Sequence, residues 1–80
     1  MWVSKEESEY VELKLALSQA LVKRRKQSNL TQVQLAKKLN SSQSRIAKME
    51  QGDPTVSLDL LVKALMAMGA TKKNIAKLIA

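Results

Sequence analysis

The 80-residue chain lacks the side chains on which most small enzymes and metal sites depend. It contains no cysteine and no histidine, which removes disulfides, thiolate ligands, the commonest metal ligand and the commonest general base. It also offers no glycine-rich phosphate loop and no pair of carboxylates on one inward helix face. We therefore expect neither catalysis nor a metal or other cofactor. A chain of this length forms one small domain that buries only about 60% of its unfolded surface.

Aromatic residues, glycine and proline are also scarce. With one tryptophan, one tyrosine and no phenylalanine, the core must be aliphatic. Strand patterns are absent and helix formers dominate, so we predict an all-α fold. No run approaches the roughly 18 apolar residues of a membrane span. The N-terminus opens with three residues, Met1 to Val3, and soon turns acidic, from Glu6 onward. This is unlike a signal peptide, so we expect a cytoplasmic protein with no membrane partner.

Charge is plentiful but unevenly distributed. The chain has 14 basic and 7 acidic side chains, a net charge of +7. Residues 1–12 contain four of the acids and one lysine, which leaves 13 basic and 3 acidic groups, a balance of +10, for residues 13–80. A basic body suits nucleic acid or an anionic membrane, although charge alone does not separate these from simple solubility. Membrane-surface binding is disfavoured because the one long candidate helix is acidic in its first half.

Capping residues and hydrophobic spacing predict five helices. The expected N-caps are hydroxyl side chains, at Ser4, Thr31, Ser42, Ser57 and Thr71. The predicted helices cover about residues 4–28, 31–38, 42–50 and 57–68, with a short fifth helix from residue 71. The inward positions of the second, third and fourth are expected to be Leu35, Ala36, Leu39, Ile46, Met49, Leu58, Leu61, Leu65 and Met68. In the fifth, one apolar face is expected from Ile75, Leu78 and Ile79.

The first predicted helix has more apolar surface than one small core can hide. One face carries Tyr10, Leu13, Leu17, Ala20 and Leu21. A second strip carries Val11, Leu15 and Val22. Either the acidic first half packs against a second copy or another partner, or these residues fold over the chain's own core. The sequence leaves both alternatives open.

The most informative stretch comprises the second and third predicted helices, joined by a turn at residues 40–42. With Ile46 and Met49 inward, residues 43, 44, 47 and 48 must face outward, and these are Gln, Ser, Ala and Lys. Glutamine can pair with adenine, lysine can reach guanine, and alanine leaves room for a thymine methyl group. The alternative is an ordinary solvated helix face. No carboxylate precedes Glu50 on this helix, which favours a groove lined by phosphates.

This stretch closely resembles the DNA-binding domain of the lambda-repressor-like, or XRE, family of transcription regulators. The shared motifs are Leu-Thr-Gln-x-x-Leu-Ala-x-Lys-Leu at residues 30–39 and Ser-x-Ser-x-Ile-x-Lys-x-Glu-x-Gly at residues 42–52. The resemblance covers about residues 21–69. It implies a five-helix fold in which the second and third helices form the helix-turn-helix. We therefore divide the chain into a helical extension over residues 1–20 and the helix-turn-helix domain over residues 21–80, both within one folded unit.

The resemblance also implies roles for single residues. Base contacts are expected from Gln43, Ser44, Lys48 and Arg45, of which Arg45 could instead reach phosphate. Phosphate contacts are expected from Thr31, Gln32, Ser42, Gln51 and, in the basic run at residues 23–26, Lys26. Relatives carry a partly buried ion pair at the positions of Arg25 and Glu50, whereas Lys23, Arg24 and Lys26 would remain available to phosphate or solvent.

Two positions depart from the family pattern. Asn40 stands in the turn where relatives prefer glycine, and asparagine tolerates the left-handed conformation that such a turn requires. Asp53-Pro54 stands where many relatives carry a basic residue that contacts phosphate. Near DNA, Asp53 would weaken binding slightly unless its carboxylate points away.

The function implied is a sequence-specific DNA-binding regulator, acting as a homodimer that represses from a near-palindromic operator. The alternative is an antitoxin that neutralises a partner toxin as well as repressing its own operon, because many small proteins of this kind are antitoxins. In that case Val11, Leu15 and Val22 would form a candidate toxin or dimer surface. The dimer surface is left open between the first and the last helix.

Overall fold

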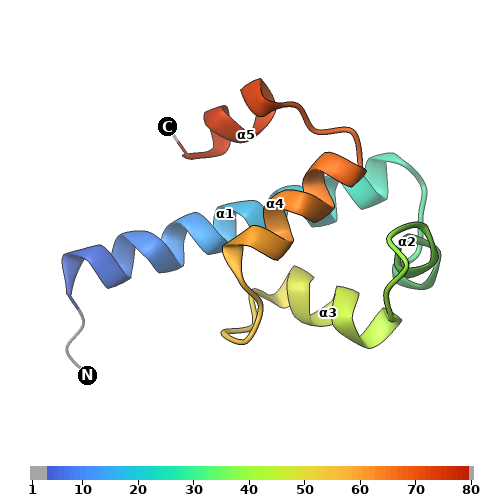
Figure 1. The fold of residues 1–80 in the computed structure, drawn as a ribbon, viewed down its shortest axis with the longest axis horizontal. Coiled ribbons are helices and arrows are strands. Elements are labelled where there is room, and N and C mark those ends of the chain that lie inside the picture. The colour runs from blue at the N-terminus through green and yellow to red at the C-terminus, as the bar shows by residue number, and fades with distance from the viewer. Residues whose placement is uncertain (1–3, 80) are drawn as a thin grey trace.

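The computed structural model describes residues 4–79 and consists of five helices in that range (Figure 1). They are α1 (Lys5–Gln27), α2 (Gln32–Lys38), α3 (Gln43–Gln51), α4 (Leu58–Ala67) and α5 (Lys72–Ile79). The predicted all-α, five-helix fold is confirmed, and the described part of the chain contains no strand. None of these helices is long and apolar enough to cross a membrane. The predicted extension and domain include residues 1–3 and 80, which lie outside the described residues.

The helices begin where the capping hydroxyls predicted. The side chains of Ser4, Thr31, Ser42 and Ser57 each accept a backbone N–H three residues further on, at 3.1 to 3.2 Å. Each of these bonds satisfies one of the N–H groups that a helix start leaves without a partner. Thr71 does the same for α5, with Asn74 as its reciprocal partner. Local sequence therefore determines all five helix starts.

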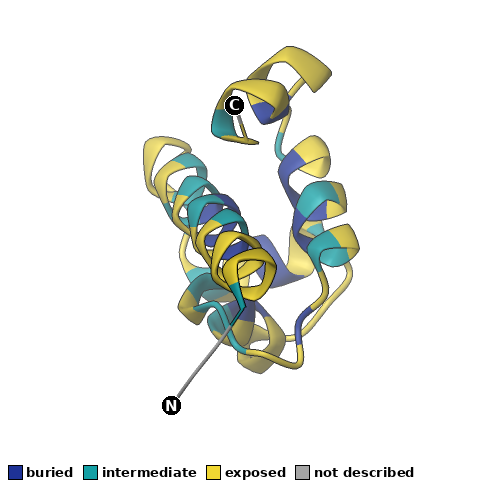
Figure 2. Cartoon of the chain, turned by 90° about the vertical axis from the view of Figure 1, so that its left-hand side faces the viewer, coloured by how far each residue is buried: buried dark blue, intermediate teal, exposed yellow. Residues whose placement is uncertain are grey.

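The core lies where α1 crosses the other helices, and α1 packs against α3, α4 and α5. In Figure 1, α5 and α3 lie on opposite sides of α1. Figure 2 shows the buried residues gathered on the inner faces of the helices. The core is aliphatic, as predicted, and consists of Leu17, Leu21, Leu35, Ala36, Ile46, Met49, Val56, Leu61, Ala64, Leu65, Ala70 and Ile75.

Along α1, the buried stripe differs from the predicted one. Leu17 and Leu21 of the predicted apolar face are buried, whereas Tyr10 on the same face is 47% exposed, in the half of the helix for which the sequence left both alternatives open. Instead, Lys14 and Ser18 complete the stripe, at 6% and 1% exposure. Tyr10 is exposed because the N-terminal half of α1 projects beyond α3 and α4 (Figure 1). The stripe thus continues past the end of the core.

The second apolar strip is only partly covered. Val11 is 53% and Leu15 43% exposed, whereas Val22 is half-buried. Leu15 lies against the end of α3, where a Cβ built on Gly52 would be 2.9 Å from the Leu15 Cδ2. On the predicted apolar face of the last helix, Ile75 is buried, whereas Ile79, in the final turn of α5, is 54% exposed.

Candidate nucleic-acid interface

A short turn connects α2 to α3, and the two helices pack against each other. Asn40 adopts the left-handed conformation, with φ of 55°, as its place in the turn predicted. The backbone N–H of Ser41 then donates to the carbonyl of Ala36 at 2.7 Å and closes the end of α2. Ser42 caps α3 directly afterwards. This tight connection leaves the outer face of α3 open to solvent.

That outer face carries three of the four residues predicted to contact bases. Gln43, Ser44 and Lys48 are exposed, and Ala47 between them is half-exposed. Ile46 and Met49 fill the core on the other side, at 0% and 2% exposure. The face is polar, short and without a carboxylate, so it can approach base edges inside a groove lined by phosphates.

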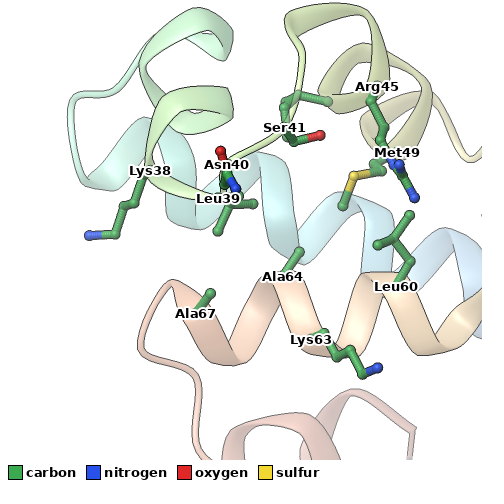
Figure 3. A pocket seen from close by; sticks show the side chains of 11 residues that line it. Lys38, Leu39, Asn40, Ser41, Arg45, Met49, Leu60, Lys63, Ala64 and Ala67 are labelled. Carbon is green, nitrogen blue, oxygen red and sulfur yellow. The ribbon is translucent and has the colours of Figure 1, made fainter.

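Arg45 lies on the flank of α3 that is turned away from Gln43. It is about 200° around the helix from Gln43, and it lines a groove of about 500 Å³ between α3, the preceding turn and α4. Figure 3 shows its side chain beside Met49 and Leu60, directed towards α4. The structure thus separates Arg45 from Gln43, but Arg45 also lines a second hollow together with Ser44 and Lys48. Both of its predicted roles, contact with a base and contact with phosphate, stay predictions.

A nearly buried ion pair joins α1 to α3. The Nε of Arg25 donates to Glu50 Oε2 at 2.6 Å and its Nη2 donates to Glu50 Oε1 at 3.1 Å. The two side chains are only 14% and 6% exposed. The third guanidinium nitrogen, Nη1, donates to the carbonyl of Leu30 at 2.9 Å. Arg25 therefore fixes the end of α1, the loop before α2 and the last turn of α3 in one arrangement.

Two glutamines extend this pair to the exposed outer face of α3. Gln32 Nε2 donates to Glu50 Oε1 at 3.0 Å, and Gln43 Nε2 donates to Gln32 Oε1 at 2.7 Å. The sequence identified all four residues singly but not their connection, which depends on how α1, α2 and α3 pack together. The contact orients the Gln43 amide and leaves its oxygen and one N–H available to a base. It also leaves one N–H of Gln32 available to a phosphate.

The other predicted phosphate contacts lie at helix ends. Thr31 and Ser42 cap α2 and α3, and each hydroxyl that accepts a backbone N–H can still donate its own proton. Gln51 is exposed in the last turn of α3, and Lys26 is exposed in the last turn of α1. Polar donors at the starts of two neighbouring helices suit a negatively charged backbone.

Within the basic run at residues 23–26, Arg24 is not simply available to phosphate. Its Nη2 donates to the Oδ1 of Asn74 at 3.0 Å and so links α1 to α5. This exposed bond uses one guanidinium nitrogen, so Arg24 is shared between α5 and the solvent that the sequence predicted for it. Lys23 and Lys26 are exposed, as expected.

The carboxylate of Asp53 is engaged within its own loop. Its Oδ1 accepts the Thr55 hydroxyl at 2.6 Å and the Thr55 backbone N–H at 2.8 Å. The hydroxyl bond, the backbone bond and the charges of Lys48 and Lys14 hold the pKa of Asp53 below its ordinary value. Asp53 therefore closes the loop before α4, which gives its carboxylate a structural role at this position.

The geometry is that of a helix-turn-helix whose exposed second helix is held by a buried ion pair. A family model described as Helix-turn-helix matches residues 21–73. The chain belongs to this family, the lambda-repressor-like or XRE group of helix-turn-helix proteins. It is accordingly a DNA-binding transcription regulator, and its partner is double-stranded DNA. Comparisons with curated proteins and with solved structures gave no match.

Proposed function

We propose that this protein is a sequence-specific transcriptional repressor that binds a near-palindromic operator as a homodimer. The observation that carries the proposal is the hydrogen bond from Gln43 to Gln32, which is itself anchored on Glu50. A side chain that only covers a solvated helix face needs no such support. A side chain that reads a base does, because bidentate recognition depends on a fixed amide orientation.

In this proposal α3 enters the major groove. Gln43, Ser44 and Lys48 read base edges, and each bidentate contact contributes about 1–3 kcal/mol of discrimination. Contacts to the backbone set the register of the protein on the duplex. They come from Thr31, Gln32, Ser42, Gln51, Lys26 and, from its place beside α4, Arg45. Residues 21–80 supply this DNA-binding unit, and the extension at residues 1–20 serves assembly.

A homodimer would place two copies of α3 in successive major grooves. Their centres would then lie about 34–36 Å apart, one turn of the double helix, and the operator would mirror the two-fold symmetry of the protein. Repression would follow from occupation of a promoter by the dimer.

A gel-shift titration tests the proposal. The protein is titrated against the DNA upstream of its own gene and against a scrambled fragment of equal length, at about 50 and about 200 mM salt. We expect tighter binding to the upstream fragment, and we expect the preference to persist at the higher salt. Equal binding to both fragments that disappears with salt would mean that positive charge alone attracts DNA.

An antitoxin role is a second candidate, and the exposed Val11 and Leu15 on α1 are what favours it. A toxin bound there would cover apolar surface that the chain does not cover itself. Co-expression with any small reading frame beside the gene tests this role. Neutralisation of that product, lost on replacement of Val11 by Lys, would support it, whereas failure to bind the product would oppose it.

A further inference from the structure

The stripe of α1 that enters the core continues in the projecting half of the helix. Lys14, Leu17, Ser18 and Leu21 are buried with the spacing of one helix face. The same spacing carried towards the N-terminus reaches Val11, Tyr10 and Glu7, all of which are exposed. Two acids of the same half, Glu9 and Glu12, lie on the opposite face of the helix.

Where the buried stripe meets the projecting half it contains Lys14, a cation for which the described residues provide no hydrogen-bond or ion-pair partner. Lys14 is 6% exposed as a whole residue, and a lysine so well covered is usually paired. Its ammonium is not among the buried side-chain atoms that lack a partner, so this group still reaches the surface. Between Ser4 and Ile79, no carboxylate lies within 4.0 Å of its ammonium group. Asp53 is near enough for the charge of Lys14 to lower its pKa, but its Oδ1 accepts both of its hydrogen bonds from Thr55.

Two copies of the stripe are complementary when they run antiparallel. From the N-terminus the stripe contains Glu7, Tyr10, Val11 and Lys14. In an antiparallel pair each Glu7 lies opposite a Lys14 and each Tyr10 opposite a Val11. A parallel pair would oppose like charges at both ends. We propose that the projecting half of α1 pairs antiparallel with that of a second copy, Glu7 of each chain binding Lys14 of the other. This contact is isologous, as a two-fold dimer requires.

The position of α3 supports a second copy as the occupant, and this step rests on the proposed operator-binding function. The turns of α1 that lie over α3 run from Ser18, which faces Gly52, to Arg25, which binds Glu50. In the proposed pair the two-fold axis passes between Tyr10 and Val11. The midpoint of the turns over α3 is about 11 residues from this axis, or ~17 Å along the helix. Two-fold symmetry doubles this separation to ~33 Å, close to the 34–36 Å or so between successive major grooves.

The orientation of the two copies also agrees. Since α5 and α3 lie on opposite sides of α1 (Figure 1), an axis that crosses α1 from the α5 side to the α3 side keeps both α3 helices on one side of the dimer. Both could then face the same duplex. The acids on the outer face, Glu9 and Glu12, remain in solvent in this arrangement.

Charge exchange tests the pairing by sedimentation equilibrium. Glu7→Lys should weaken dimerisation about tenfold or more, because it opposes Lys14 with a like charge. Glu7→Lys combined with Lys14→Glu should restore it. The matched control is Glu12→Lys, which makes the same change in net charge on the outer face and should leave the dimer intact. Circular dichroism of each variant establishes that it is folded.

Crosslinking provides a second measurement that does not depend on charge or on Lys14. The chain has no cysteine, so single replacements report on one position only. Val11→Cys lies beside the axis and should form a covalent dimer on mild oxidation. Glu7→Cys should not, because the two copies of position 7 are about 10 Å apart along an antiparallel pair, beyond the reach of a disulfide. Crosslinking of both variants would indicate a parallel pair and overturn the proposal.

The outcomes separate this interface from the proposed function. A wild-type monomer, or a dimer unaffected by Glu7→Lys, overturns the interface, and specific DNA binding can still be present. A dimer that responds as expected supports the interface even where the gel shift finds no sequence preference. A wild-type monomer that instead forms a complex with a neighbouring gene product, lost in Glu7→Lys, assigns the stripe to a different protein and overturns the second copy as occupant.

Discussion

The two halves of α1 carry one continuous stripe but have different surroundings. In the C-terminal half, Leu17 and Leu21 are at most 2% exposed and Arg25 is bound on three nitrogens. In the N-terminal half, Tyr10 and Val11 are about half exposed. The spacing of apolar residues determines which face of a helix can be buried. How much of that face is buried depends on how far the neighbouring helices extend along it. A helix of 23 residues is longer than the four short helices beside it can cover.

Removal of the ion pair should have the largest effect, because it releases the covered half from α3. Arg25→Ala or Glu50→Ala should cost about 3–5 kcal/mol of unfolding free energy, since each leaves a nearly buried charge without its partner. Urea denaturation followed by circular dichroism measures this. The control is Asp59→Ala, which breaks the exposed pair with Lys63 and should change stability by about 1 kcal/mol or less. An Arg25→Ala variant that unfolds like the wild type would contradict the structural role.

Truncation of one side chain in each half of α1 to alanine tests whether the two halves differ in how well they are covered. Leu17→Ala should cost about 2–5 kcal/mol, because it leaves a cavity in the core. Tyr10→Ala should cost about 0.5 kcal/mol or less when unfolding is measured on the monomer. At concentrations where a dimer forms, Tyr10→Ala should also lower the melting temperature. Similar costs for the two variants in the monomer would mean that the N-terminal half is covered after all.

The covered half of α1 holds α3 in place through Arg25 and Glu50, and replacement of Gln43 tests whether α3 reads bases. Gln43→Ala should reduce discrimination at one base position by about 1–3 kcal/mol and leave nonspecific affinity nearly unchanged. Lys26→Ala, as the control, should weaken binding to all sequences alike and flatten its salt dependence. Titrations against a set of single-base operator variants measure both. Uniform weakening by Gln43→Ala would assign that side chain to the backbone instead.

Gly52, which ends α3, lies against α1 where the covered and the projecting halves of that helix meet, beside Leu15 and Ser18. Its φ of 71° disfavours any L side chain, and a Cβ there would be 2.9 Å from the Leu15 Cδ2. Gly52→Ala should therefore cost about 1–2 kcal/mol from its left-handed conformation alone. Gly69→Ala is the control, because Gly69 also has a positive φ, 93°, but nothing within 4 Å of its Cβ position. A larger cost at Gly52 in thermal unfolding would measure the contact with Leu15, and equal costs would mean that Leu15 yields freely.

The smallest effect should come from Asp53. Because its pKa in the folded protein lies below the ordinary value of 3.8, its contribution to stability is present above that value and is lost as the pH falls through the lower, folded-state pKa. Asp53→Asn should remove this part of the acid dependence of unfolding and slightly destabilise the protein at neutral pH. An unchanged stability profile between neutral pH and the acid limit would show that the bonds to Thr55 stabilise little.

The features predicted correctly from the sequence are local ones. Ser42 as a cap, Asn40 in the turn and Gly52 at the end of α3 depend on a few neighbouring residues, and each adopts the expected conformation. What the sequence left open depends on packing between distant elements. The spacing of Tyr10 fits the buried face, but spacing does not reveal how far along α1 the neighbouring helices extend.

Polar members of the core stripe were missed for a related reason. A search for apolar periodicity passes over Lys14 and Ser18, although their positions fit the stripe as well as those of the leucines do. The bond between Gln32 and Gln43 was missed because it joins two helices whose angle the turn determines. Helical spacing applied to every residue type would have found the first two, but no local signal in the sequence reveals the third.

The most direct test of sequence-specific recognition by α3 is selection of binding sites from a random DNA library by the wild-type protein. We predict an enriched motif made of two inverted half-sites whose centres are about 10–10.5 base pairs apart, and we predict that Gln43→Ala relaxes one symmetric position in both halves. A library recovered without an enriched motif would contradict base reading by α3. An enriched motif with a single, unrepeated half-site would contradict binding as a dimer but would still support base reading by α3.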